Sequence, residues 1–215
     1  MLGLIPANNA LVDTEISLAA ELGCRSCGKR QSPSAFVSVH GQLEEGIRKG
    51  GLSEYDLIII DCSPAFSVLT RTAVIASDHV LVPARPDYLS VYGLAAFSHR
   101  LREIVSTYNS KLVAAGGRKN DPGRATADVL GVVFTMAGVH RDAPIQSSRD
   151  PMSRVHALEL HVFDSVIREN KTAFTEAVQK LRPVVLMDLK RKGPGRELRD
   201  LADEFVAKLW GGKRG

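Results

Sequence analysis

The feature that most constrains the fold of this chain is a run of four apolar residues, Leu57–Ile60, followed directly by Asp61. The run is rich in β-branched side chains and lacks the polar–apolar alternation of a strand with one wet face. It therefore predicts a strand buried on both faces, as in a parallel sheet covered by helices. An acid placed after such a strand emerges at the carboxyl end of the sheet, where ligands bind in open α/β folds.

The rest of the chain alternates between short apolar runs and amphipathic stretches. Further strands are predicted at Leu2–Pro6, His79–Pro83, Val129–Thr135, Phe163–Ile167 and, as a short edge strand, Val184–Met187. Helices are predicted at Asn8–Leu22, Gln42–Lys49, Ser67–Ala76, Val91–Tyr108, Ala173–Leu181 and Arg196–Trp210, with loops at Cys24–Val39 and Gly116–Arg124. This order predicts a three-layer α/β fold, with a mostly parallel sheet and helices on both faces.

Length and composition predict a single domain over residues 1–215, since 215 residues with 44% hydrophobic content can bury one sizeable core. Three cysteines argue against a disulfide framework and favour a cytoplasmic protein. No apolar run approaches the roughly 20 residues that span a bilayer, so no membrane role is expected. Residues 188–215 form a basic C-terminal helix and tail, which indicates either a contact with phosphates or a solvated helix face.

The segment Gly23–Arg30 matches the spacing of a phosphate-binding loop, except that Arg30 replaces the usual Ser or Thr. Such a loop follows a buried strand and opens a helix, whereas this one follows a predicted helix and runs into a predicted loop. We therefore interpret Gly23 as a helix stop and Gly28 as a turn residue. Cys24 and Cys27 form a C-x-x-C pair without two further ligands in a metal-binding spacing, so we interpret them as unpaired thiols.

An ordered series of short motifs surrounds the apolar run. They are Tyr55-Asp56, Asp61-Cys62-Ser63-Pro64, Leu69-Thr70, Ala76–Pro83, Gly93-Leu94, Gly131–Met136 and Val166–Asn170. In this order they resemble the ParA/MinD (Soj-like) partition ATPases, a P-loop NTPase family with a deviant phosphate loop, and the resemblance runs from Leu2 to Leu209. Three positions depart from the family pattern: Ser63 and Arg168 stand where it has proline, and Thr72 where it has asparagine.

The resemblance implies roles for individual residues. Asp61 would be the Walker B acid, which is catalytic and holds Mg²⁺ through a water molecule. The residues implied to lie near the base and ribose of ATP or ADP are Thr135, Met136, Arg168, Glu169 and Asn170. Because the family binds DNA non-specifically as a nucleotide-bound dimer, Lys190, Arg191 and Lys192 are implied nucleic-acid contacts. A homodimer and a ParB-like centromere-binding protein, or another adaptor, are the implied partners, with association with the nucleoid.

The family's opening strand and lysine-bearing phosphate loop are not among these 215 residues. We therefore expect the chain to correspond to the C-terminal two-thirds of the family domain, truncated and inactive alone, or completed by another chain. Two functions remain open. One is a chromosome or plasmid partitioning ATPase, whose ATP binding and hydrolysis are linked to dimerisation and DNA binding. The other is a non-catalytic ParA-like binding module that acts through a partner protein or DNA.

Overall fold

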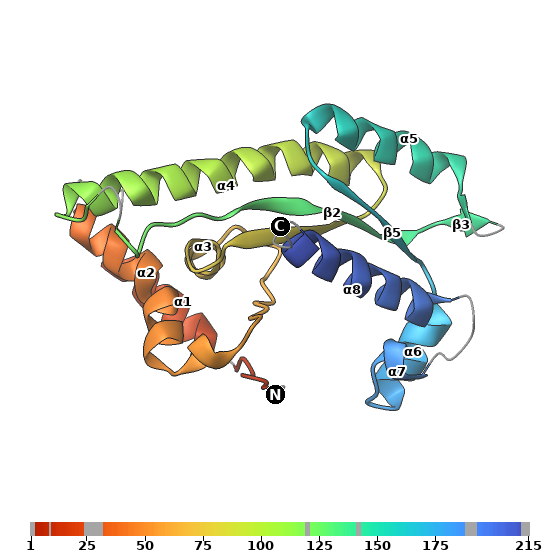
Figure 1. Ribbon diagram of the computed structural model, residues 1–215, viewed down its shortest axis with the longest axis horizontal. Helices are drawn as coiled ribbons and strands as arrows, with labels where there is room; N and C mark the ends of the chain where they lie inside the picture. Colours follow the sequence, from red (N-terminus) through yellow and green to blue (C-terminus); the bar gives the residue numbers. More distant parts are fainter. Residues whose placement is uncertain are drawn as a thin grey trace. The chain divides into compact units, whose positions relative to one another are not determined.

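The computed structural model describes residues 3–8, 10–23, 32–118, 121–140, 143–187 and 193–211 (Figure 1). Two compact units make up the chain. The helical unit comprises Met1–Val80 and His99–Asp128, and the sheet unit comprises Leu81–Ser98 and Val129–Gly215. Among the helices of the described ranges, none is both long and apolar enough to cross a membrane.

A three-stranded sheet forms the centre of the sheet unit. Its strands are β1 (His79–Ala84), β2 (Asp128–Ala137) and β5 (Val162–Arg168), in the order β1-β2-β5, and β2 and β5 are parallel. The strands predicted at His79–Pro83, Val129–Thr135 and Phe163–Ile167 are therefore confirmed. Each is short, apolar and joined to the next by a helical segment, as parallel pairing requires.

Apolar residues cover this sheet on both faces. One cluster joins Val132 and Phe134 of β2 to Leu94 of α4 (Tyr88–Ala114) and to Val155, the last residue of α5 (Gln146–Val155). A second cluster is made by Leu130, Val133, Phe163 and, from α8 (Pro194–Trp210), Leu201, Phe205 and Leu209. A parallel sheet between helical layers confirms the predicted α/β fold class.

The pairing of β2 with β5 is interrupted by two register shifts. Val132 lies opposite Val162, Phe134 opposite Val166, and Ala137 opposite Arg168. Over the first interval β5 advances four residues while β2 advances two, and over the second β2 advances three while β5 advances two. Met136, in the second interval, has a φ of 55°, which is rare for a residue other than glycine. Bulges of this kind are common beside functional sites, where they redirect side chains.

Several small elements complete the sheet unit. They are β3 (Val139–His140) and β4 (Ala143–Pro144), which pair antiparallel, then η3 (His156–Leu158), α6 (Lys171–Gln179) and α7 (Val184–Met187). The prediction of an edge strand at Val184–Met187 is wrong. The N–H of Leu186 donates to the Pro183 carbonyl at 2.9 Å, so the segment turns immediately after the proline and becomes helical.

The helical unit contains α1 (Ala10–Glu21), α2 (Pro33–Lys49), η2 (Leu52–Glu54), α3 (Val68–Ile75) and the second half of α4. Helix α2 begins at Pro33, within the predicted loop Cys24–Val39, and not at Gln42. The Ser32 hydroxyl accepts the Ala35 N–H at 3.1 Å, and Pro33 occupies the first turn, where its missing N–H costs nothing.

Gly23 confirms its predicted role as a helix stop. It follows α1 with a φ of 81°, and its N–H donates to the Ala20 carbonyl at 3.0 Å. A left-handed glycine after the last helical turn is a common way to end a helix. Gly28, Arg30 and the pair Cys24 and Cys27 lie outside the described residues.

Two strand predictions in the helical unit are wrong: the one at Leu57–Ile60 and the one at Leu2–Pro6. Leu57, Ile58 and Ile59 are 39%, 41% and 77% exposed, and the segment forms no strand. In the second segment, the described residues Leu4 and Ile5 are 88% and 76% exposed and irregular. A strand requires a neighbour that completes its backbone hydrogen bonds, and within the described ranges neither segment belongs to a sheet.

Candidate functional site

Asp61 lies in the helical unit and is exposed; it follows the run Leu57–Ile60, of which Leu57, Ile58 and Ile59 are exposed. The turn that follows it is fixed to α3 by two side chains. The Thr70 hydroxyl donates to the Ala65 carbonyl at 2.6 Å, and Arg71 Nε donates to the Phe66 carbonyl at 3.3 Å. Asp61 is therefore followed by a turn that is hydrogen-bonded to α3, whereas most of the apolar run before it is exposed to solvent.

The surroundings of Asp61 limit how a metal ion could bind there. Within the described ranges, no group of three or more His, Cys, Asp or Glu side chains could hold a metal. A hydrated Mg²⁺ needs only one or two carboxylates when phosphate oxygens and water supply the other ligands. An exposed single carboxylate fits that role and does not fit a metal site made by protein ligands alone.

The thiol of Cys62 lies beside the carboxylate of Asp61. Partial burial raises its pKa, and the negative charge of Asp61 raises it further. Since the thiolate is the reactive form, this cysteine is held in its less nucleophilic state.

The five residues predicted to lie near a base and ribose come together in the sheet unit. Thr135 and Met136 lie near the end of β2, and Arg168 ends β5, followed by Glu169 and Asn170. Ala137 lies opposite Arg168, and the Glu169 N–H donates to the Ala137 carbonyl at 3.0 Å. These residues therefore share the carboxyl edge of two parallel strands, the usual ligand side of such a sheet.

Their side chains have different surroundings. Met136 is 54% exposed, and Glu169 is exposed with its carboxylate 3.7 Å from Lys171 Nζ. The Asn170 side-chain oxygen accepts the Ala173 N–H at 3.0 Å and so caps α6. Asn170 thus fixes the start of α6 at the same edge of the sheet.

Arg168 is engaged by α8. Its Nε forms an ion pair with Glu197 Oε1, and its N–H donates to Glu197 Oε2 at 2.9 Å. The two side chains are only 26% and 17% exposed, so the pair is largely shielded from water. Sequence reasoning missed Glu197, and it also missed Glu204, which lies on the same helix face two turns later.

A hollow of about 450 Å³ opens beside this edge, within the size range of small-molecule sites. Polar and apolar residues line it about equally, and they include the start of α8: Arg168, Asn170, Ala173, Glu176, Lys180, Arg182, Val184, Met187, Gly193 and Pro194. Two of the five predicted base-site residues, Arg168 and Asn170, therefore line it. The predicted nucleic-acid contacts Lys190, Arg191 and Lys192 lie outside the described residues.

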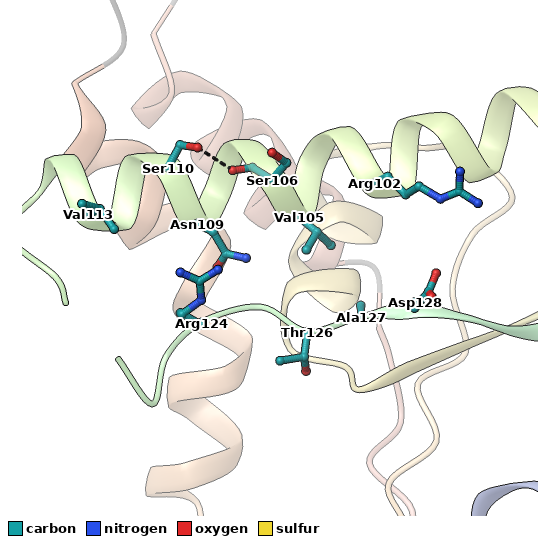
Figure 2. Close-up of a pocket in the computed structure, with 10 residues that line it drawn as sticks. All are labelled: Arg102, Val105, Ser106, Asn109, Ser110, Val113, Arg124, Thr126, Ala127 and Asp128. Atoms are coloured by element: carbon teal, nitrogen blue, oxygen red, sulfur yellow. Dashed lines mark hydrogen bonds between the residues drawn. The ribbon is translucent and has the colours of Figure 1, made fainter. Parts of the chain in front are cut away.

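A second hollow, of about 750 Å³, lies in the helical unit between α4 and the segment that leads into β2 (Figure 2). Asn109 fixes this segment to α4, because its side chain donates to the Ala125 carbonyl at 2.9 Å and accepts the Ala125 N–H at 3.0 Å. Figure 2 shows Arg102 and Arg124 toward opposite ends, with Thr126 between them. None of the predicted site residues lines this hollow.

Comparisons with known proteins place the chain in a family. The model of the AAA domain family matches residues 1–114. The chromosome partitioning protein ParA of Caulobacter vibrioides is 30% identical over 207 residues, which cover 96% of this chain and 65% of that protein. The chain thus spans just under two-thirds of the length of this relative.

Solved structures show the same fold. A complex of a Cyanothece McdA variant with ATP is 21% identical and gives a TM-score of 0.64 over 95% of this chain and 65% of that one. The cell division ATPase MinD of Pyrococcus furiosus is also 21% identical, with a TM-score of 0.54 over 79% of this chain and 59% of that one. The family-model match over residues 1–114, together with the parallel sheet, shows that the chain belongs to the AAA domain family.

Proposed function

We propose that the chain acts in a ParA-like chromosome or plasmid partitioning ATPase, which binds and hydrolyses ATP and couples this to dimerisation and non-specific DNA binding. The observation that carries the proposal is the gathering of Thr135, Met136, Arg168, Glu169 and Asn170 at one edge of the parallel sheet. Their order in the sequence alone predicts this grouping, and β2 and β5 bring them to the same edge.

The residues of this edge fit a nucleotide base and ribose. The adjoining hollow has a suitable volume, and Asn170, Arg168 and the backbone at the end of β5 supply polar groups around it. When bound, Mg²⁺ would neutralise charge on the phosphates. In this chain Asp61 would hold one of its water ligands, since its carboxylate is exposed and directly follows the apolar run Leu57–Ile60.

We further propose that Leu57–Ile60 needs a neighbouring strand before the site is fully active. The exposure of Ile59, at 77%, supports this, because a β-branched apolar run is normally covered in an α/β sheet. The phosphate loop is also absent from these 215 residues, so we expect weak nucleotide binding and slow or no hydrolysis by residues 1–215 alone.

A direct test is a titration of purified residues 1–215 with a fluorescent ATP analogue, with and without Mg²⁺. We expect weak binding that Mg²⁺ strengthens in the wild type and not in Asp61→Ala. Asp56→Ala is the matched control, since Asp56 is an exposed acid before the same apolar run. ATP hydrolysis by 1–215 at rates typical of the family would refute the incompleteness, and an equal loss in both variants would refute the role of Asp61.

The alternative is a non-catalytic ParA-like module that acts through a partner protein or DNA, in the cytoplasm or at the nucleoid. The mixed polar and apolar lining of the 450 Å³ hollow does not by itself require a nucleotide. No ATP binding at millimolar concentration, together with salt-sensitive binding to duplex DNA or capture of a ParB-like protein, would favour this alternative.

A further inference from the structure

The outer edge of β5 carries backbone N–H groups that β2 does not reach, because β5 is the last strand of the sheet. Such groups need acceptors, and an open edge also invites pairing with other chains. Here the acceptors are carboxylates of α8, which lies alongside β5 (Figure 1). Asp164 and Ser165 donate their N–H groups to the two oxygens of Glu204 at 2.7 and 2.9 Å. The Arg168 N–H donates to Glu197 at 2.9 Å.

The first register shift explains why two neighbouring amides are available to Glu204. Residues in a regular strand direct successive N–H groups to opposite sides. Asp164 and Ser165 lie in the interval where β5 advances four residues against two of β2, so both can face outward. Glu204 therefore holds the bulged middle of β5.

Glu197 contacts the end of β5, whereas Glu204 contacts its middle, and Glu197 also binds a side chain. It contacts Arg168, the last residue of β5, through both the backbone N–H and the guanidinium group. It also lies in the first turn of α8, where its own N–H donates to the Gly193 carbonyl at 3.1 Å. Arg168 and Gly193 both line the hollow beside this edge, so Glu197 ties together two of its walls.

We propose that Glu197 is a positioning residue for the nucleotide site, an inference that rests on the function proposed above. It fixes the carboxyl end of β5, and thereby sets the position of Asn170, which begins α6 and lines the hollow. Glu204 binds the same strand without reaching this end, so it stabilises the fold and leaves the site unchanged.

The physical reason is the strength of hydrogen bonds to a carboxylate that is shielded from water, which are about twice as strong as neutral ones. Glutamine at position 197 keeps one acceptor oxygen and loses the charge that holds the guanidinium. The end of β5 would then be held less firmly. Asn170, which follows it, would be less well placed to contact a bound base. Loss of one such interaction corresponds to roughly a tenfold change in an equilibrium constant.

The test compares Glu197→Gln with Glu204→Gln in residues 1–215. Three quantities are measured for each: the thermal unfolding temperature, amide hydrogen exchange of peptides 162–166 and 167–172, and the Kd of a fluorescent ATP analogue with Mg²⁺. We expect Glu197→Gln to expose 167–172 to exchange and to raise Kd about tenfold. Glu204→Gln should expose 162–166 and change Kd less than about twofold at a similar loss of unfolding temperature.

Arg168→Ala separates the two contacts that Glu197 makes, since it removes the ion pair and keeps the backbone N–H. Because Arg168 itself lines the hollow, the readout for this variant is amide exchange: less exposure of 167–172 than in Glu197→Gln supports the backbone contact as the main hold on the strand. Equal increases in Kd for Glu197→Gln and Glu204→Gln, with ATP bound by the wild type, overturn the positioning role and leave the proposed function standing. A wild-type chain that binds no ATP while Glu197→Gln still exposes 167–172 refutes the proposed function, and with it the role of Glu197 in binding.

Discussion

The segment Leu57–Ile60 is uniformly apolar, whereas the strand β5 also contains Asp164 and Ser165, yet only β5 lies in a sheet. One side of β5 pairs with β2, and its outer amides are held by Glu197 and Glu204. The segment Leu57–Ile60 has neither kind of partner within the described ranges, and Ile59 is 77% exposed. Apolar and β-branched side chains therefore make a strand possible, and the backbone partners decide whether it forms.

The comparison also shows two ways of meeting the backbone's requirement. Pairing with a strand satisfies many groups at once and buries the side chains on both faces. Carboxylates from a helix satisfy only the outward N–H groups, but they close the edge to further pairing. The sheet unit uses both, whereas the uncovered run in the helical unit uses neither.

The largest expected effect on stability is at a buried residue of the sheet, in contrast to the mostly exposed run Leu57–Ile60. Phe134 is fully buried in the cluster between β2, α4 and α5, with 0% exposure. Phe134→Ala should lower the free energy of unfolding by about 3–5 kcal/mol, since it removes a large side chain and leaves a cavity. Urea denaturation followed by circular dichroism measures this. A loss below about 1 kcal/mol would mean that this face of the sheet is not packed in solution.

The second effect tests whether carboxylates replace a neighbouring strand at the edge of β5. Glu204→Gln should lower the free energy of unfolding by about 1–3 kcal/mol at neutral pH, because it weakens charged hydrogen bonds to two amides. Asp203→Asn, an exposed acid on the same helix, is the control and should change it by less than about 0.5 kcal/mol.

The same pair of variants predicts a dependence on acid. Burial acts to raise the pKa of Glu204, but hydrogen bonds from Ser165 and Asp164 and the charge of His161 hold it, on balance, below its ordinary value of 4.5. A lowered folded pKa gives stability that is complete above 4.5 and is lost as the pH falls below it. Wild type and Glu204→Gln should therefore converge in stability as the pH falls below 4.5, and a constant difference would contradict the role of the charge.

Much of this architecture could be predicted from local sequence, because the strands at His79–Pro83, Val129–Thr135 and Phe163–Ile167 carry their own apolar pattern. The start of α2 was missed, although Ser32 before Pro33 is a recognisable signal for a helix N-terminus. The failures at Leu57–Ile60 and Leu2–Pro6 have a different cause. A strand depends on a partner elsewhere in the chain, and a short apolar run carries no information about it.

In the candidate site, too, residues in local motifs could be predicted, whereas residues that act through distant contacts could not. The motif series predicted that Thr135, Arg168 and Asn170 lie near a nucleotide, and the structure places them at one carboxyl edge of the sheet; their role in binding stays a prediction. Glu197 and Glu204 were not found, since they meet Arg168 and Asp164 across separations of 29 and 40 residues. Their spacing of two helical turns was a visible signal, but an acid on a predicted amphipathic helix is ordinarily a solvated one.

A third, smaller effect concerns His40, a buried residue whose ring nitrogens lack hydrogen-bond partners among the described residues. His40 of α2 is 0% exposed and packs against Phe36 with ring centroids 4.3 Å apart, and neither of its ring nitrogens has a hydrogen-bond partner among the described residues. Burial, and the nearby charge of Arg71, lower its pKa from 6.5 to about 4. His40 is therefore neutral in the folded state at neutral pH.

The sign of the pH dependence follows from this. Because the unfolded chain takes up the proton first, the free energy of unfolding should fall as the pH drops from 6.5 toward 4, by about 2 kcal/mol at pH 5. His40→Leu should remove this decline, whereas His99→Leu, at an exposed position of α4, should retain it. Parallel pH profiles for wild type and His40→Leu would show that His40 reaches water or a partner in solution.

The smallest effect on stability is expected at the uncovered run, and it sharpens the comparison most directly. Ile59→Thr keeps the β-branched shape and removes apolar surface from a side chain that is 77% exposed. It should change the free energy of unfolding by less than about 0.5 kcal/mol, while reducing concentration-dependent association measured by light scattering, because exposed apolar runs without a strand partner promote it. A loss above about 1 kcal/mol would mean that Ile59 is covered in solution, and that this run, like β5, has found the partner it needs.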